Sequence, residues 1–131
     1  MGKICIKRRK QLNKDLINNY DLLIEPTFPF IKKYKIGNIK IITKEIDYIY
    51  IKIPYNHNNK NRLLNIYKKL LDIINVNEYK KVLINYINMS LINECCSYNN
   101  EIYKEIYILI KDYIKDIDIN IDIVTPYNIF D

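Results

Sequence analysis

Apolar residues recur every three or four positions in two stretches of the chain, which is the spacing of one face of a helix. The first stretch, residues 62–74, reads RLLNIYKKLLDII, and the second runs from about residue 100 to residue 115. We expect both to be amphipathic helices. A shorter pattern of the same period, over residues 12–24, stops before Pro26, which cannot continue a helix, and it predicts a short helix or a docked arm.

Elsewhere the pattern has the period of two that is typical of strands. YKI and IKIIT lie on either side of Gly37-Asn38, and this arrangement predicts a hairpin with a tight turn, followed by a strand over residues 47–53. The apolar run at residues 82–88 indicates a buried central strand. In residues 119–125 (INIDIVT), Ile119, Ile121 and Ile123 alternate with Asn120 and Asp122, which predicts a half-exposed strand near an edge of the sheet.

These elements follow one another in the order ββαβαβ, and strands separated by helices pair in parallel through right-handed crossovers. The predicted fold is α/β, a small mixed sheet with two covering helices. We expect a single domain over residues 1–131, with a basic arm or short helix at 1–30 and the α/β core at 31–131. Sheets of this kind bind ligands outside the carboxyl ends of their parallel strands, here the connection at 88–99 and the tail after Thr125.

The segment VLINYINMSLINECCSYNNEIYKEI resembles the strand, loop and helix of STAS or SpoIIAA-like domains, including the bacterial SEC14-like proteins. The resemblance implies a small ββαβαβ regulatory module whose helix start carries a phosphorylated Ser in the anti-anti-sigma branch. Asn85 then takes the position of that family's strand-end Asp and Asn93 that of its loop Asp. Glu94 or Cys95 stands where the family has its Ser, so none of the three matches is an identity.

Composition changes how the charge is interpreted. Ile, Asn, Lys and Tyr supply 29, 18, 18 and 13 of the 131 residues, and Ala supplies none, which indicates an AT-rich genome and weakens any argument from lysine content. The net charge of +6 equals the charge of residues 1–14, which hold six Lys or Arg and no acid. This arm is either a solvated, frayed terminus or a segment that contacts the phosphates of nucleic acid.

Few residues suit catalysis. His57 is the only histidine and lies in an Asn-rich loop. We interpret Cys95 and Cys96 as reduced structural thiols, because two adjacent cysteines do not have the spacing of zinc ligands. Two glycines, Gly2 and Gly37, do not make a phosphate-binding loop, so nucleotide-binding folds of the Rossmann or P-loop type are excluded. We therefore predict no enzymatic activity, no cofactor and no metal site.

Two functions remain open, beside a third interpretation as a cysteine-dependent enzyme that would use Cys95 or Cys96. The first is a non-enzymatic binding or regulatory module that acts through a protein partner or as a homodimer. Its predicted contact residues are Ser90, Asn93, Glu94, Cys95 and Ser97. The alternative is a nucleic-acid-binding accessory protein that uses the arm and a Tyr/Lys surface. Its predicted contact residues are Lys7, Arg8, Arg9, Lys10, Tyr48, Tyr50 and Lys52. No apolar run reaches the length of a membrane helix, and we expect a cytoplasmic protein without membrane contact.

Overall fold

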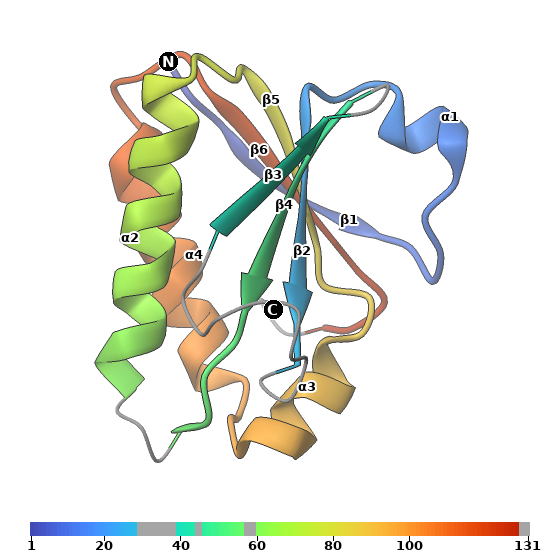
Figure 1. Cartoon of the computed structure of the whole chain (residues 1–131), viewed down its shortest axis with the longest axis vertical. Coiled ribbons are helices and arrows are strands. Elements are labelled where there is room, and N and C mark those ends of the chain that lie inside the picture. Colours follow the sequence, from blue (N-terminus) through green and yellow to red (C-terminus); the bar gives the residue numbers. More distant parts are fainter. Residues whose placement is uncertain (29–38, 44–45, 57–59, 129–131) are drawn as a thin grey trace.

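The described part of the chain contains six strands, which form one sheet in the order β1-β6-β5-β2-β4-β3 (Figure 1). The computed structural model describes residues 1–28, 39–43, 46–56 and 60–128. The strands are β1 (Ile4–Arg8), β2 (Leu22–Thr27), β3 (Ile39–Thr43), β4 (Asp47–Lys52), β5 (Lys81–Asn85) and β6 (Asn120–Thr125). All neighbours pair in parallel except β3, which is antiparallel to β4.

Helices cover the two faces of the sheet unequally. They are α1 (Lys14–Ile17), α2 (Lys60–Val76), α3 (Met89–Cys96) and α4 (Glu101–Ile114). In Figure 1, α2 and α4 lie side by side against one face, and α1 lies on the other side of the sheet. No described helix combines the length and the apolar character required to cross a bilayer.

The main core lies between the sheet and α2, α3 and α4. The strands contribute alternate residues to it, and these are fully or almost fully buried: Leu22, Ile24, Ile49, Ile51, Val82, Ile84, Ile121 and Ile123. On the opposite face Leu23, Leu83 and Val124 form a smaller cluster, which the segment around α1 covers with Leu12, Leu16, Ile17 and Tyr20. Most of the apolar burial that stabilises the fold is therefore on the α2/α4 side.

The α/β class predicted from the sequence is confirmed, and so are the two long helices, which are α2 and α4. The predicted strands at 39–43, 47–53, 82–88 and 119–125 are observed as β3, β4, β5 and β6, with bounds shifted by a few residues. The predicted partner strand YKI and its Gly37-Asn38 turn lie outside the described residues. Ile39 to Thr43 pair instead with β4.

The predicted order ββαβαβ is not observed, because two strands lie within the segment assigned to the arm. Residues 4–8 form β1 and pair with β6, so β6 lies between two neighbours and is not an edge strand. Residues 22–27, assigned to the end of a helical pattern, form β2 at the centre of the sheet. A strand that is buried on both faces has apolar residues at most positions. Such a continuous apolar run does not show the period of two, so it can equally be taken for the end of a helix.

Candidate functional site

Side chains of different chemistry meet where the parallel strands end. The carboxyl ends of β1, β6, β5, β2 and β4 share one edge of the sheet, and α3 begins there, directly after the turn that follows β5. This edge is where open α/β sheets place their ligands.

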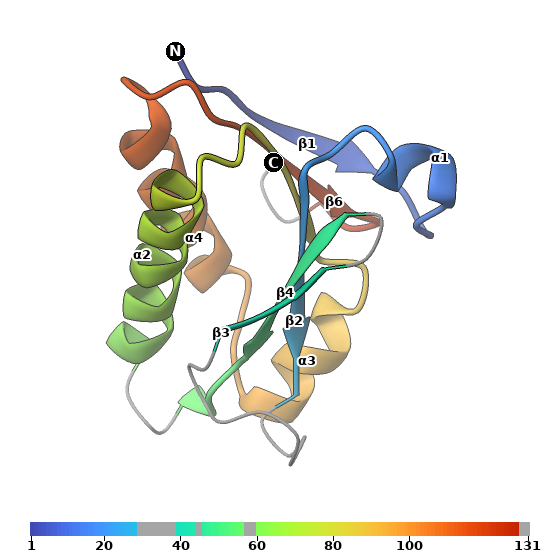
Figure 2. The same cartoon turned by 45° about the horizontal axis from the view of Figure 1, so that its top comes forward.

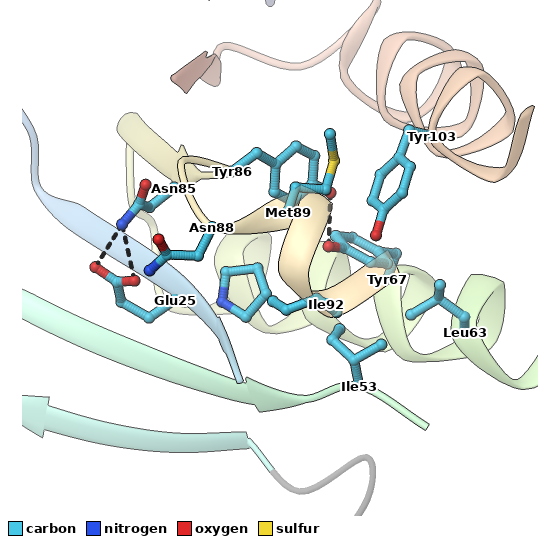
Figure 3. Close-up of a pocket in the computed structure, with 11 residues that line it drawn as sticks. Glu25, Ile53, Leu63, Tyr67, Asn85, Tyr86, Asn88, Met89, Ile92 and Tyr103 are labelled. Carbon is cyan, nitrogen blue, oxygen red and sulfur yellow. Dashed lines mark hydrogen bonds between the residues drawn. The ribbon is translucent and has the colours of Figure 1, made fainter. Parts of the chain in front are cut away.

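Glu25 on β2 and Asn85 on β5 lie beside each other at this edge (Figure 3). The Asn85 amide nitrogen donates to both carboxylate oxygens of Glu25, at 3.1 and 2.9 Å, while the Asn85 oxygen accepts from the backbone N–H of Ile87 at 3.0 Å. Burial raises the pKa of Glu25, and the hydrogen bond from Asn85 only partly opposes that shift. A partly buried carboxylate with a raised pKa is a frequent mark of a functional site.

Tyr86, the next residue, anchors the turn to the core. Its backbone N–H donates to the carbonyl of Val124 at 2.8 Å, and its hydroxyl donates to that of Tyr67 on α2 at 2.6 Å. The ring of Tyr103 on α4 packs edge-on against the Tyr86 ring, with centroids 5.2 Å apart. Burial raises the pKa of each of these three hydroxyls, so all three stay protonated at neutral pH.

A small cavity lies between Glu25 and these tyrosines, and Asn88, Met89 and Ile92 also line it (Figure 3). Its volume is about 10 Å³, close to the smallest space that holds one water molecule. A ligand larger than water therefore has to lie over the strand ends rather than inside the domain.

The amino end of α3 presents unpaired backbone donors to the same edge. The N–H of Met89 bonds to the carbonyl of Tyr86, and the N–H of Ile92 bonds to that of Asn88. Asn88 makes no side-chain cap, and the N–H groups of Ser90 and Leu91 have no partner within the described chain. Such groups, together with the helix dipole, favour an anion.

Tyr127 closes the site from the segment after β6. Its hydroxyl and that of Ser90 are 2.8 Å apart, and its backbone N–H donates to the Thr125 hydroxyl at 3.2 Å. The side chain of Tyr127 is 37% exposed, so its ring is partly open to solvent. An exposed aromatic ring beside free backbone donors is suited to contact a planar or sugar-like group.

Cations lie at the end of β1. Arg8 and Arg9 are exposed, the Arg9 N–H donates to the carbonyl of Thr125 at 3.2 Å, and the Arg8 guanidinium contacts the side chain of Asn128. These contacts place both arginines beside the segment that carries Tyr127. The residues taken for the frayed arm are thus held at the carboxyl edge of the sheet.

The structure brings the five predicted partner-contact residues together, since all of them lie on α3 or at its end. Ser90, Glu94 and Ser97 are exposed, whereas Asn93 and Cys95 are partly buried. The Asn93 side-chain oxygen has no hydrogen-bond partner within the described chain. Next to Cys95, burial raises the pKa of Cys96 to about 12, so that thiol is protonated at neutral pH.

The residues predicted to bind nucleic acid form two separate groups. Lys7, Arg8, Arg9 and Lys10 lie on or after β1, while Tyr48, Tyr50 and Lys52 lie on β4, and three strands separate β1 from β4. The Tyr48 and Tyr50 rings stack with centroids 6.4 Å apart, and Tyr48 packs against the smaller core cluster. Lys7 is also close to Asp122 on β6, at 3.9 Å. His57 lies outside the described residues.

Sequence reasoning missed Glu25 and Tyr127. Glu25 was taken as part of the arm, although an acid within the apolar run LLIEPT is a signal that can be recognised. The tail after Thr125 was singled out as a ligand region, but no residue in it was named. The omission of Glu25 follows from placing β2 outside the sheet.

No protein-family model and no curated protein matches the chain. Among solved structures, the alphavirus protein P23pro-zbd superposes with a TM-score of 0.68 at 13% identity over 98% of this chain. The chain spans only 22% of that alphavirus protein. The macrodomain of Thermus aquaticus DarG superposes with a TM-score of 0.59 at 10% identity, covering 95% of this chain and 99% of the macrodomain. At these identities the likeness shows a shared fold.

One prediction has to be corrected. The sequence predicted that the chain is not an enzyme, and the likeness to the DarG macrodomain contradicts this, because macrodomains are a domain family with enzymatic members. The absence of recognisable catalytic motifs from the sequence was therefore not a sufficient reason to exclude enzymatic activity. The resemblance to STAS domains is tested by neither structure and stays a prediction.

Proposed function

We propose that the chain binds a nucleotide-like ligand, with a phosphate, a sugar and a base, over the carboxyl ends of β2, β5 and β6. The observation that carries this proposal is the position of the Glu25 carboxylate beside the amino end of α3. The Glu25 end of the site accepts hydrogen bonds, and the end formed by the first turn of α3 donates them. The predicted contacts with a protein partner or with nucleic acid remain hypotheses beside it.

In this proposal, Glu25 accepts hydrogen bonds from the hydroxyl- or amine-bearing part of the ligand. Asn85 holds the carboxylate with one amide nitrogen, which leaves lone pairs on both oxygens. Ribose hydroxyls and the amino group of a base are donors that suit an ionised carboxylate, and hydrogen bonds to a charged acceptor are stronger than neutral ones. Asn88, exposed at the mouth of the cavity, adds a second amide.

In this proposal, the amino end of α3 donates hydrogen bonds to the phosphate. The unpaired N–H groups of Ser90 and Leu91 are close to the Ser90 hydroxyl, and no acid occurs in the first turn of the helix. Arg8 and Arg9 supply positive charge on the far side of Tyr127. Arginine suits phosphate geometry because its planar group donates two parallel hydrogen bonds.

The spacing of the strands favours an elongated ligand. Three inter-strand intervals separate β2 from β1, or about 14 Å at the usual spacing of about 4.8 Å. A ligand that contacts both Glu25 and the arginines therefore carries several linked groups. ADP-ribose, which joins a base, two riboses and two phosphates, is a suitable probe.

Isothermal titration calorimetry of the whole chain with ADP-ribose, AMP and ribose 5-phosphate tests the proposal. We expect ADP-ribose to bind most tightly, and Glu25→Gln to weaken its binding about tenfold, because the amide replaces an acceptor oxygen by a donor. Chromatography of the mixture afterwards detects any conversion of the ligand.

Glu78→Gln is the matched control, because Glu78 is exposed and precedes β5, at the opposite edge of the sheet. It should bind like the unmodified chain. Equal affinity of Glu25→Gln and Glu78→Gln would place the ligand elsewhere. The absence of heat with all three ligands at about 1 mM would reject the proposal.

A further inference from the structure

β1 is an edge strand with an unpaired side. Its only strand neighbour among the described elements is β6 (Figure 2). The carbonyl of Lys3 accepts from Ile121, and the N–H of Arg9 donates to Thr125, so the odd-numbered residues turn their backbone groups toward β6. Backbone groups alternate along a strand, and those of Ile4 and Ile6 therefore face outward.

Two grooves of similar size lie on either side of this edge. One has a volume of about 420 Å³ and lies on the α1 side of the sheet, where Lys3, Lys7 and Tyr20 line it. The other has a volume of about 430 Å³ and lies between β1 and α4, where Tyr107, Ile114 and Ile4 contribute to its wall. A strand added to β1 would direct alternate side chains into these two grooves.

The grooves differ in chemistry. The α1-side groove contains three lysines, Lys3, Lys7 and Lys81, against a single acid, Asp122. Lys3 forms no ion pair with another residue in the described part of the chain. The groove beside α4 has Ile4, Tyr107 and Ile114 in its walls, together with Lys111 and Lys115. On the same face of β1, Ile4 and Ile6 are only partly buried against the main core.

β6 pairs with the other side of β1, so its sequence indicates which residues suit a strand next to β1. Ile121 and Ile123 are buried on the α4 side, opposite Ile4 and Ile6, and Asp122 points to the other side, 3.9 Å from Lys7. The Tyr20 hydroxyl also donates to Asp122 at 2.6 Å. A second strand on the open side finds the same alternation of apolar and cationic surfaces.

We propose that β1 binds an extended segment of a partner protein in which isoleucine-like and acidic residues alternate. The segment adds a seventh strand to the sheet, with its apolar side chains in the groove beside α4 and its carboxylates against Lys3 and Lys7. Backbone hydrogen bonds to Ile4 and Ile6 supply affinity, and the two grooves supply selectivity. The partner segment contacts β1 from Lys3 to Lys7, whereas the proposed ligand site uses Arg8 and Arg9 at the end of the same strand.

Charge argues against a second copy of the chain as the occupant. The edge reads K-I-C-I-K-R-R-K from Lys3 to Lys10 and contains no acid. Antiparallel pairing of two such strands would bring like charges opposite one another, which is unfavourable. An acidic partner segment removes this repulsion.

Fluorescence anisotropy with the labelled peptide SNIDIDIDNS and the whole chain tests the proposal. We expect saturable binding that weakens with salt, and no binding of SNIKIKIKNS, because its lysines repel Lys3 and Lys7. Lys3→Glu should weaken binding of the acidic peptide at least tenfold. Lys69→Glu, the same change on the exposed face of α2, should leave it unchanged.

Two modified peptides test the backbone contacts without altering the protein. One is N-methylated at its three Ile residues and the other at its three Asp residues. Only one set of amides faces β1, so one peptide should lose binding and the other should retain it.

Equal binding of both methylated peptides, or of the acidic and the basic peptide, would overturn the proposal. So would an absence of binding at about 1 mM peptide. A chain that sediments as a dimer and becomes monomeric with Ile6→Pro would assign the edge to a second copy instead, since proline at an edge removes an outward-facing N–H.

Discussion

The hydroxyl of Tyr86 donates a 2.6 Å hydrogen bond to the hydroxyl of Tyr67, and both side chains are buried. This bond links the turn after β5, where the proposed ligand site begins, to the middle of α2. Together with the bond from the Tyr86 backbone N–H to the carbonyl of Val124, it fixes the turn against the main core.

Removing one partner of this bond should destabilise the fold. Tyr67→Phe leaves the Tyr86 donor buried without an acceptor, and we expect a loss of about 1–3 kcal/mol in the free energy of unfolding. The double variant, with Tyr86→Phe as well, should lose less than the sum of the two single variants, because no unsatisfied group remains. Urea denaturation of the four proteins measures the coupling, and additive losses would show that the bond contributes little.

The raised pKa of Glu25 predicts a pH-dependent stability. In the unfolded chain this carboxyl ionises near its ordinary pKa, whereas in the folded chain burial keeps it protonated to higher pH. Its contribution to stability is therefore greatest below the ordinary pKa and falls as pH rises through the folded value. Glu25→Gln removes this dependence, so the variant should gain stability relative to the unmodified chain between about pH 4 and pH 7. Urea denaturation at both pH values tests the sign, and a constant difference would contradict it.

Gly2 has to be a glycine for steric reasons. Its N–H donates to the carbonyl of Ile114 at 3.1 Å, and a Cβ atom on Gly2 would lie 2.4 Å from the carbonyl oxygens of Ile114 and Ile119. Gly2→Ala should displace the start of β1 from the end of α4. We expect faster amide hydrogen exchange over residues 3–6, with α2 unaffected, and unchanged exchange in β1 would show that the backbone adjusts without cost.

Glu78 ends α2 in a left-handed conformation, with φ of 61°. This conformation costs a residue with a Cβ atom about 1 kcal/mol, and glycine adopts it freely. Glu78→Gly should therefore raise the free energy of unfolding by about 1 kcal/mol, while Glu78→Ala should not. Thermal unfolding of the three proteins distinguishes the cases, and equal shifts for Gly and Ala would assign the effect to the lost charge.

The sequence predicted best where the periodic pattern was long. The apolar stripes of α2 and α4 identified both helices, and the alternation in residues 119–125 identified β6. Pairing partners were harder to predict, because the alternation of apolar and polar residues does not say which strand lies next to which. β6 was predicted near an edge because Asn120 and Asp122 alternate with its isoleucines. It lies instead between β1 and β5, where Tyr20 and Lys7 contact Asp122.

The candidate site could be predicted only in part. The connection after β5 and the tail after Thr125 were identified from the general position of ligands in α/β sheets. Glu25 was not, because its strand was mistaken for a helical pattern. The alternation of Ile4 and Ile6 with Lys3, Cys5 and Lys7 was present in the sequence, but the concentration of charge in this segment suggested a solvated terminus.

The pairing of β1 with β6 also determines the order in which the fold can be completed. Lys3 bonds to Asn120, 117 residues later in the chain, and β6 lies between β1 and β5. During synthesis β1 leaves the ribosome before the other described strands, but it has no strand neighbour among them until residues 120–125 follow. Until then its apolar residues and unpaired backbone are exposed, and contacts so distant in sequence form slowly. We expect the positive charges of this segment to protect the unpaired strand from aggregation until β6 is made.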